Sequence, residues 1–400
     1  MRGSSSSYHL CRSSLRLAVS LFLSVFLYVS AVEGQTVQDD NSGTMLMATH
    51  TDSMASWQRY PTYEVYTAMM QHYASHYSQL CHLDTMGYSF NGRLLLSLVI
   101  ETAAPKRTMM YSGVIHGDEP LSYVLLLHLA DTLLSSYGTD SQITGLLDSV
   151  AVVIMPVTNP DGLYRRGNNS VANGLRTNAN GIDLNRNFPD PFGYGLGADI
   201  QVENQAFINY ADSMRFSHSA ALHSGDEVLN YPWDSFTSSQ RYVEQWQWWQ
   251  QVCQRFVATV HRHDSQRLCT VRNSGYVAGG DWYVIHNGRQ DYMNYYHGVY
   301  EMTMELSFVK QVASSHIPIY WNAYAEALIG YIAEVPPTAS PAAIYALQRA
   351  ADSIKVYPNP TRGAVTVRCG GSVEYFDLSH CPTGVNVVKA FGRNIKVVKY

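Results

Sequence analysis

The chain has 400 residues, of which 46% are hydrophobic and 15% are charged. This composition excludes a disordered, collagen-like or coiled-coil protein, and the length allows one large domain with a small second one. The formal net charge of −5 argues against nucleic acid as a partner, because nucleic-acid binders carry strongly basic surfaces.

The N-terminal residues have the pattern of a secretory signal peptide. Three arginines precede an apolar run at 17–28, and the small residues Val29-Ser30-Ala31 follow it. A membrane anchor is the alternative, but the run is shorter than the roughly 20 residues that a membrane-spanning helix needs. We therefore expect residues 1–31 to be a signal peptide, residues 32–58 to be a lead-in or pro-segment, and the mature chain to have no integral membrane span.

Strand-like and helix-like segments alternate from residue 59 to residue 335. Apolar and β-branched runs predict strands, in chain order, at 93–101, 108–115, 149–157, 217–222 and 299–306. Helical periodicity predicts helices at 120–137, 202–214, 242–263 and 320–334. This alternation predicts an α/β domain over 59–335, with a mixed, mainly parallel sheet covered by helices on both faces. Ligands in such domains bind at the carboxyl ends of the strands.

The composition changes after this domain. Residues 336–352 begin with a proline-rich stretch and predict a linker. Short β-branched runs at 364–368, 385–389 and 395–398 then predict a small all-β tail over 353–400.

Five of the six cysteines lie in the expected mature chain. Proximity in the sequence favours disulfides between Cys253 and Cys269 and between Cys369 and Cys381, with Cys81 left unpaired.

Two candidate metal ligands follow the expected strand at 108–115. His116 and Glu119 are three residues apart, so they face one ion if this turn is helical, and zinc accepts an imidazole together with a carboxylate. A catalytic zinc needs a third protein ligand. His223 follows the strand expected at 217–222, so it should reach the same edge of the sheet; a structural histidine is the alternative.

Several further motifs follow in the chain: Asn159-Pro160-Asp161-Gly162, Arg176, Asp183-Leu184-Asn185-Arg186-Asn187-Phe188-Pro189, Asn230-Tyr231-Pro232-Trp233-Asp234 and Glu305-Leu306-Ser307. Together with His116, Glu119 and His223, in this order and at these spacings, they resemble the zinc metallocarboxypeptidases. The resemblance is to the regulatory branch typified by carboxypeptidases D, E, M and N, and it extends from about residue 60 to residue 335.

The resemblance implies one Zn²⁺ per chain, held by His116, Glu119 and His223. It also implies that Glu305 is the general base that activates the zinc-bound water, and that Arg176 stabilises the oxyanion. Elementary chemistry agrees, since a carboxylate can pass a proton from water to the leaving amine and a fixed cation stabilises a developing oxyanion. A structural, paired acid is the alternative for Glu305.

The resemblance also implies the substrate-binding residues. Asn185 and Arg186 match the pair that grips the terminal carboxylate, and Tyr283 matches a mobile tyrosine that closes over the substrate. Asp234 and Gln290 match the pocket for a C-terminal Lys or Arg. For Asp234 the alternative is a solvated turn acid, and for Tyr283 a surface aromatic.

The sequence departs from the pattern of the branch beside this pocket. The segment Asn287-Gly288-Arg289-Gln290-Asp291 stands where the branch usually has Gly-Gly-Met-Gln-Asp, so Arg289 introduces a cation next to a site expected to bind one.

The tail resembles a second family. Val356-Tyr357-Pro358-Asn359-Pro360-Thr361-Arg362-Gly363 and the basic β-rich ending at 394–400 are similar to the C-terminal sorting domain of the Bacteroidota type IX secretion system. The resemblance implies that residues 353–400 form a sorting domain and that the protein passes through the periplasm and then the outer membrane. An ordinary small β module is the alternative.

The sequence therefore predicts a secreted or cell-surface, zinc-dependent metallocarboxypeptidase that releases C-terminal Lys or Arg. Its expected partners are the C-termini of peptides or proteins and the type IX secretion machinery. Two alternatives stay open: a related zinc peptidase that trims bacterial cell-wall peptides, and a catalytically silent peptide-binding surface protein.

Overall fold

The structure is a computed structural model, which describes residues 43–103, 107–269, 274–337, 354–357, 361–369, 372–390 and 393–399. The expected signal peptide, most of the expected linker and the Pro358–Pro360 part of the sorting motif lie outside these residues.

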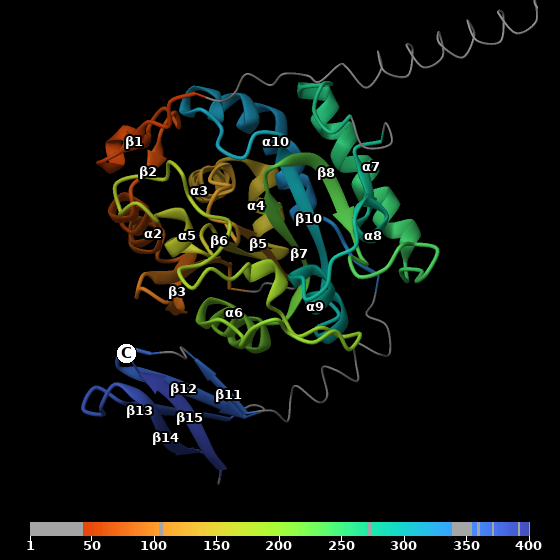
Figure 1. Ribbon diagram of the computed structural model, residues 1–400. Helices are drawn as coiled ribbons and strands as arrows, with labels where there is room; N and C mark the ends of the chain where they lie inside the picture. The colour runs from red at the N-terminus through yellow and green to blue at the C-terminus, as the bar shows by residue number, and fades with distance from the viewer. Residues whose placement is uncertain are drawn as a thin grey trace, which may run out of the picture. The chain divides into compact units, whose positions relative to one another are not determined.

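An eight-stranded sheet with the strand order β3-β4-β6-β5-β7-β10-β8-β9 forms the centre of the fold (Figure 1). Its strands are β3 (Cys81–Tyr88), β4 (Leu94–Ile100), β5 (Arg107–Gly113), β6 (Val150–Met155), β7 (Phe216–His223), β8 (Asp226–Tyr231), β9 (Tyr276–Ala278) and β10 (Tyr300–Ser307). The central strands β6, β5, β7 and β10 pair in parallel, whereas β3, β4 and β8 join antiparallel. The predicted mixed, mainly parallel sheet is confirmed.

Helices cover both faces of this sheet. They are α2 (Tyr63–His76), α3 (Leu121–Ser136), α4 (Ser141–Leu147), α5 (Pro160–Leu163), α6 (Val202–Ser213), α7 (Trp246–His263), α8 (Gly279–Trp282), α9 (Arg289–Tyr296) and α10 (Ile317–Ile332). No helix in the described ranges is long and apolar enough to cross a membrane.

Alternate side chains of each central strand enter different buried clusters. Val152 and Ile154 of β6 pack with α2, α3, α4, α7 and α10, whereas Val153 and Met155 pack with α6 and α9. Successive side chains of a strand point to opposite faces, so a run such as β6, in which all six residues are buried, requires cover on both sides.

The later part of the expected lead-in packs onto the domain. β1 (Met47–Ala48) pairs with β2 (Tyr60–Pro61), and Ala48 and Met54 are buried in the larger cluster. The backbone N–H of Leu46 also donates to Ser314 Oγ at 2.6 Å.

The tail forms small antiparallel sheets, as predicted. One sheet contains β11 (Ile354–Tyr357), β12 (Ala364–Cys369) and β13 (Ser372–Asp377), and the other pairs β14 (Gly384–Ala390) with β15 (Arg393–Lys399). The tail has its own buried cluster, formed by Val356, Val365, Val367, Leu378, Val388 and Val397.

The expected disulfides are wrong. Cys253 is a free, fully buried thiol on the core face of α7, whereas Cys269 lies beyond the end of that helix, with its Sγ 3.0 Å from Gln266 O. Cys381 is also a free thiol, so it is not joined to Cys369. Cys81 is free and buried.

Candidate active site

The expected catalytic residues come together at the carboxyl ends of three neighbouring parallel strands. His116 follows β5, His223 ends β7, and Glu305 lies near the end of β10. The register of the parallel pair β7 and β10 sets Glu305 directly beside His223. The strand order therefore brings together residues that are more than 80 positions apart in the chain.

A tight turn after β5 presents the first two candidate ligands. The Glu119 N–H donates to His116 O at 3.2 Å, which closes the turn and places both side chains on one side. A Cβ atom on Gly117 would clash with the backbone of Gly162, and one on Gly174 would clash with Gly117 O. The turn thus fits against the neighbouring loop only because these positions lack side chains.

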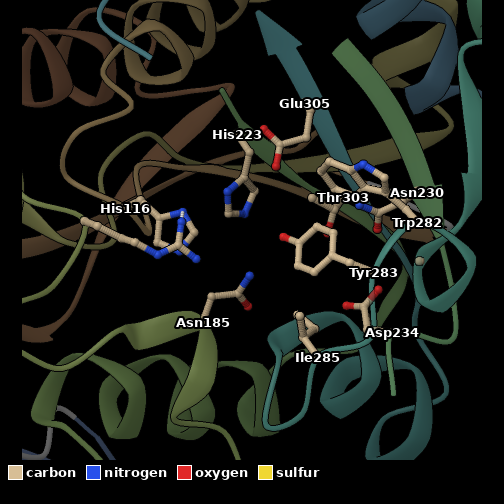
Figure 2. Close-up of a pocket in the computed structure, with 12 residues that line it drawn as sticks. His116, Asn185, His223, Asn230, Asp234, Trp282, Tyr283, Ile285, Thr303 and Glu305 are labelled. Carbon is tan, nitrogen blue, oxygen red and sulfur yellow. Dashed lines mark hydrogen bonds between the residues drawn. The ribbon is translucent and has the colours of Figure 1, made fainter. Parts of the chain in front are cut away.

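The three candidate ligands form a compact buried cluster. Glu119 Oε1 lies 3.0 Å from His116 Nδ1, and Glu119 Oε2 lies 3.0 Å from His223 Nδ1. One ligand atom from each residue lies within 4.8 Å of the others, and each of the three side chains is 3% exposed. Figure 2 shows the two imidazoles next to each other, and their ring centroids lie 4.8 Å apart in an edge-on arrangement.

The chemistry of this cluster fits a zinc ion. Burial lowers the pKa of His223 to about 4, so its imidazole is neutral and able to bind metal at neutral pH. Burial raises the pKa of Glu119, but the two histidines outweigh that effect and hold it well below its usual value. Two imidazoles with one carboxylate leave a fourth position open, as catalytic zinc sites do.

Glu305 faces the cluster with an unused acceptor. The residue is 8% exposed, and its Oε2 is buried without a hydrogen-bond partner among the described residues. Burial, followed by the charges of Glu119 and Asp226, raises its pKa well above the usual value. A buried acid without a partner is costly in a structural role, so the paired structural acid considered above does not describe Glu305.

Arg176 lies directly against the cluster, with its Nη1 3.4 Å from His116 Nδ1, and Asp183 orients it. Its Nε donates to Asp183 Oδ2 at 2.8 Å, and its Nη1 lies 3.9 Å from Glu119 Oε1. Asp183 Oδ1 lies 3.2 Å from His116 Nε2, so one carboxylate orients both the arginine and the histidine. The sequence analysis named Asp183 only as the first residue of a motif and did not predict this contact with His116.

Asn185 and Arg186 lie on the short 3-10 helix η2 (Leu184–Arg186), beside Tyr283. The N–H of Arg289 donates to Asn185 Oδ1 at 3.0 Å, which fixes the orientation of the amide. Burial raises the pKa of Tyr283, and Arg186 partly offsets this, which places the two side chains near each other. Tyr283 is 46% exposed, and its ring lies at the cavity between the histidines and Asp234 (Figure 2).

A buried carboxylate lies at the far end of the cavity. Asp234 is 6% exposed, and Gln290 Nε2 donates to its Oδ1 at 2.7 Å. Burial and the charge of Asp291 raise the pKa of Asp234 well above its usual value. A Cβ atom on Gly279 would clash with Asp234 Oδ1, so a glycine there preserves space for the carboxylate. Asp234 is therefore not a solvated turn acid.

Arg289 does not enter the pocket. Its guanidinium is 2% exposed, its Nε lies 2.8 Å from Glu301 Oε1, and it packs over the ring of Phe207. The departure from the family pattern therefore adds no cation beside Asp234.

Five further residues line the cavity, and the sequence analysis assigned none of them a role: Asn230, Gly279, Trp282, Ile285 and Thr303. Thr303 was accessible to prediction, because it lies two positions before Glu305 on one strand and so shares its face. Lys310, whose Nζ lies 2.9 Å from Asp118 Oδ2 and 3.0 Å from Glu119 Oε1, had no sequence signal.

Comparisons with known proteins agree with this geometry. A family model described as zinc carboxypeptidase matches residues 66–327. Carboxypeptidase M of Mus musculus is 33% identical over 293 residues, which cover 69% of this chain and 66% of the relative. Carboxypeptidase SOL1 of Arabidopsis thaliana is 30% identical over 75% of this chain and 60% of the relative. The chain thus spans less than two thirds of the length of these relatives.

Solved structures show the same fold. Carboxypeptidase A from Helicoverpa armigera aligns with a TM-score of 0.59 and 20% identity, covering 72% of this chain and 77% of the other. Thrombin activatable fibrinolysis inhibitor aligns with a TM-score of 0.59 and 18% identity, covering 75% and 77%.

Proposed function

This chain belongs to the zinc carboxypeptidase family, and we propose that it hydrolyses the C-terminal peptide bond of peptides or proteins and releases a C-terminal Lys or Arg. One observation carries this proposal. A buried cluster of His116, Glu119 and His223 shares a cavity with the unpartnered acid Glu305 and with the buried carboxylate of Asp234.

His116, Glu119 and His223 would hold one Zn²⁺ per chain. When bound, zinc supplies a Lewis acid that polarises the scissile carbonyl and makes water more acidic. Asp183 supports this set from outside, because its contact with His116 Nε2 fixes the ring while Nδ1 faces Glu119.

Glu305 acts as the general base. Its unpartnered Oε2 accepts a proton from the attacking water and later gives it to the leaving amine. The raised pKa of Glu305 suits this exchange, because a carboxyl group with a higher proton affinity is a stronger base once it is ionised.

Two arginines bind the negatively charged groups of the reaction. Arg176, oriented by Asp183, stabilises negative charge that develops on the scissile carbonyl oxygen. Arg186, with Asn185, binds the free carboxylate at the chain end, which a planar guanidinium holds through two hydrogen bonds. Tyr283 is exposed enough to move over the bound substrate. These residues restrict cleavage to the last peptide bond.

Asp234 selects the side chain that is released. An ionised carboxylate in this buried pocket pairs with an ammonium or guanidinium group, whereas an apolar side chain leaves it buried without a cation. Gln290 orients the carboxylate through its hydrogen bond to Oδ1.

The export route is part of the same proposal. The expected signal peptide at 1–31 would direct the chain to the periplasm, and the tail at 353–400 would engage the type IX secretion machinery for transfer to the cell surface or the medium. The tail has a buried cluster of its own, which supports the proposal that it is a separate module for recognition by the type IX secretion machinery.

The test compares four matched peptides that end in Arg, Lys, Leu or arginine amide, with the full chain as purified, after chelation and after zinc is restored. We expect cleavage of the Arg and Lys peptides, weak cleavage of Leu, none of the amide, and loss and recovery of activity with zinc. Cleavage that survives chelation, or cleavage of the amide, would contradict the proposal.

A further inference from the structure

A second cavity, of about 240 Å³, lies at the end of the central strands that is opposite to the candidate active site. The candidate active site lies at the carboxyl ends of β5, β7 and β10, whereas Arg107, Phe216 and Tyr300 line this cavity at the amino ends of the same strands. Strands of seven or eight residues separate the two sites by roughly 25 Å, because each residue advances a strand by about 3.3 Å. We call this space the rear cavity.

The lining of the rear cavity is cationic. Its positive charges are those of Arg107 and Arg215; the imidazole of His297 also lines it, and no acidic side chain does so among the described residues. Asp212, which is not part of the lining, has its Oδ1 3.7 Å from His297 Nε2. A cavity of this charge stands out on a chain with a net charge of −5 and favours an anionic occupant.

The two arginines have donors available for such an anion. Arg107 Nη2 donates to Ala333 O at 3.2 Å, but Arg107 Nε is buried and has no hydrogen-bond partner among the described residues. Burial lowers the pKa of Arg107. In contrast, Arg255, which lies outside this cavity and has a carboxylate partner, has its pKa raised by hydrogen bonding to Glu334. Arg215 is exposed and makes no ion pair or hydrogen bond within the described parts of the chain. An anion bound here would give the guanidinium donors of Arg215 an acceptor and would bring a negative charge close to Arg107.

The rest of the lining is apolar. Phe216 is 7% exposed and Val299 is 2% exposed, and Met214, Tyr300, Pro336 and Pro337 complete the wall. The cavity volume of about 240 Å³ is many times the roughly 15 Å³ that a single water molecule needs. This space suits a compact organic molecule with one charged end better than a hydrated inorganic ion.

We propose that the rear cavity binds a small organic anion, with its carboxylate or a similar acidic group on Arg107 and Arg215 and its apolar body against Phe216 and Val299. The site is independent of the proposed peptidase activity. Because the two sites lie at opposite ends of the same strands, its ligand leaves the candidate active site open.

The test uses 4-phenylbutyrate as the probe and 4-phenyl-1-butanol as a neutral probe of matched shape, with binding to the full chain measured by calorimetry. Since the proposed active site also binds carboxylates, the measurement is made on an Arg186→Ala background as well as on the unaltered chain. We expect saturable binding of one phenylbutyrate that persists in the Arg186→Ala chain, with the alcohol at least about tenfold weaker, because hydrogen bonds to charged groups are strong.

Variants then locate the site. On the Arg186→Ala background, Arg215→Ala should weaken phenylbutyrate binding about tenfold and Arg215→Lys less, while Arg262→Ala, which removes an exposed arginine of α7, should leave it unchanged. Arg107→Met gives a second test at the buried donor. Absence of saturable binding on the Arg186→Ala background, equal binding of the alcohol, or binding that is insensitive to both Arg215→Ala and Arg107→Met would overturn the proposal.

Discussion

The carboxyl groups of this chain have different tasks because their surroundings differ. Glu119 is buried between two imidazoles that hold its pKa down, whereas Glu305 and Asp234 are buried with other acids nearby and have raised pKa values. Burial alone disfavours the charged form of all three, so the neighbouring charges decide which of them is held ionised. A metal ligand, a proton acceptor and a receptor for a cation are the roles that these three environments support.

Replacement of Glu305 with Gln tests its role as the proton acceptor. We expect kcat to fall by a factor of about 10² to 10⁴, the usual contribution of a general base, while zinc content and the free energy of unfolding change little. Timed peptide assays measure kcat, metal analysis measures the zinc content, and denaturant titration measures the free energy of unfolding. Retention of more than half of the wild-type kcat would exclude Glu305 as the base.

The raised pKa of Asp234 predicts how specificity depends on pH. Above this pKa the carboxyl group is ionised and pairs with a C-terminal Arg; as the pH falls through it, the group becomes neutral and the preference is lost. The ratio of kcat/KM for Arg-ending over Leu-ending peptides should therefore rise with pH. In Asp234→Asn this ratio should be at least about tenfold lower and flat with pH. A wild-type ratio that does not change with pH would show that another group selects the substrate.

At the scale of elements, strands and helices with strong hydrophobic patterns were predictable. The continuous apolar run that becomes β6 and the repeating apolar positions of α3 are each visible within one short segment. The helix α2, Tyr63–His76, was missed because its sequence mixes tyrosines, histidines and methionines without a clear apolar stripe. The edge strand β3 was missed for a similar reason, since its middle residues are polar and only partly buried.

The residues of the candidate active site also divide into those with a local sequence pattern and those without one. The residues that match family motifs were named from the sequence, and the parallel strand register explains why three of them meet. Contacts made by Asp183 and Lys310 depend on where separate loops lie in space, which no local pattern encodes. The direction of the Arg289 side chain was likewise not readable, because its partner Glu301 comes from another element.

The turn between β5 and α3 gives a prediction about an element. Gly117→Ala would push a methyl group into the backbone of Gly162 and displace the turn that carries His116 and Glu119. We expect zinc affinity to fall at least about tenfold, as measured by competition with a chelator of known affinity. The control is Gly145→Ala in α4, where a Cβ atom meets nothing within 4 Å and zinc affinity should not change. Equal zinc affinity in Gly117→Ala and the wild type would contradict this account of the turn.

At the scale of the whole molecule, two bodies of structure have separate hydrophobic interiors. The strands and helices between Ala48 and Ile332 enclose two buried clusters, and the tail from residue 354 onward encloses another. Their different compositions were visible in the sequence as a change from alternating helices and strands to short strands alone. The proposal assigns catalysis to the first body and transport to the second.

Deletion of residues 353–400 tests this division. In the native host, the shortened chain should accumulate in the periplasm instead of at the surface or in the medium, as followed by fractionation and immunoblotting. Its hydrolysis of small peptides should stay within about twofold of the wild type, because every proposed catalytic residue lies before residue 306. Normal export of the shortened chain would show that the tail is not the sorting signal.

A zinc titration of the metal-free full-length chain tests the central claim most directly, with hydrolysis of an Arg-ending peptide as the readout. Three buried ligands that meet at one point predict that activity rises in proportion to added zinc and stops rising at one ion per chain, and that His223→Ala shows no such rise at the same concentrations. Full activity before any zinc is added, or an unchanged titration in His223→Ala, would contradict the account.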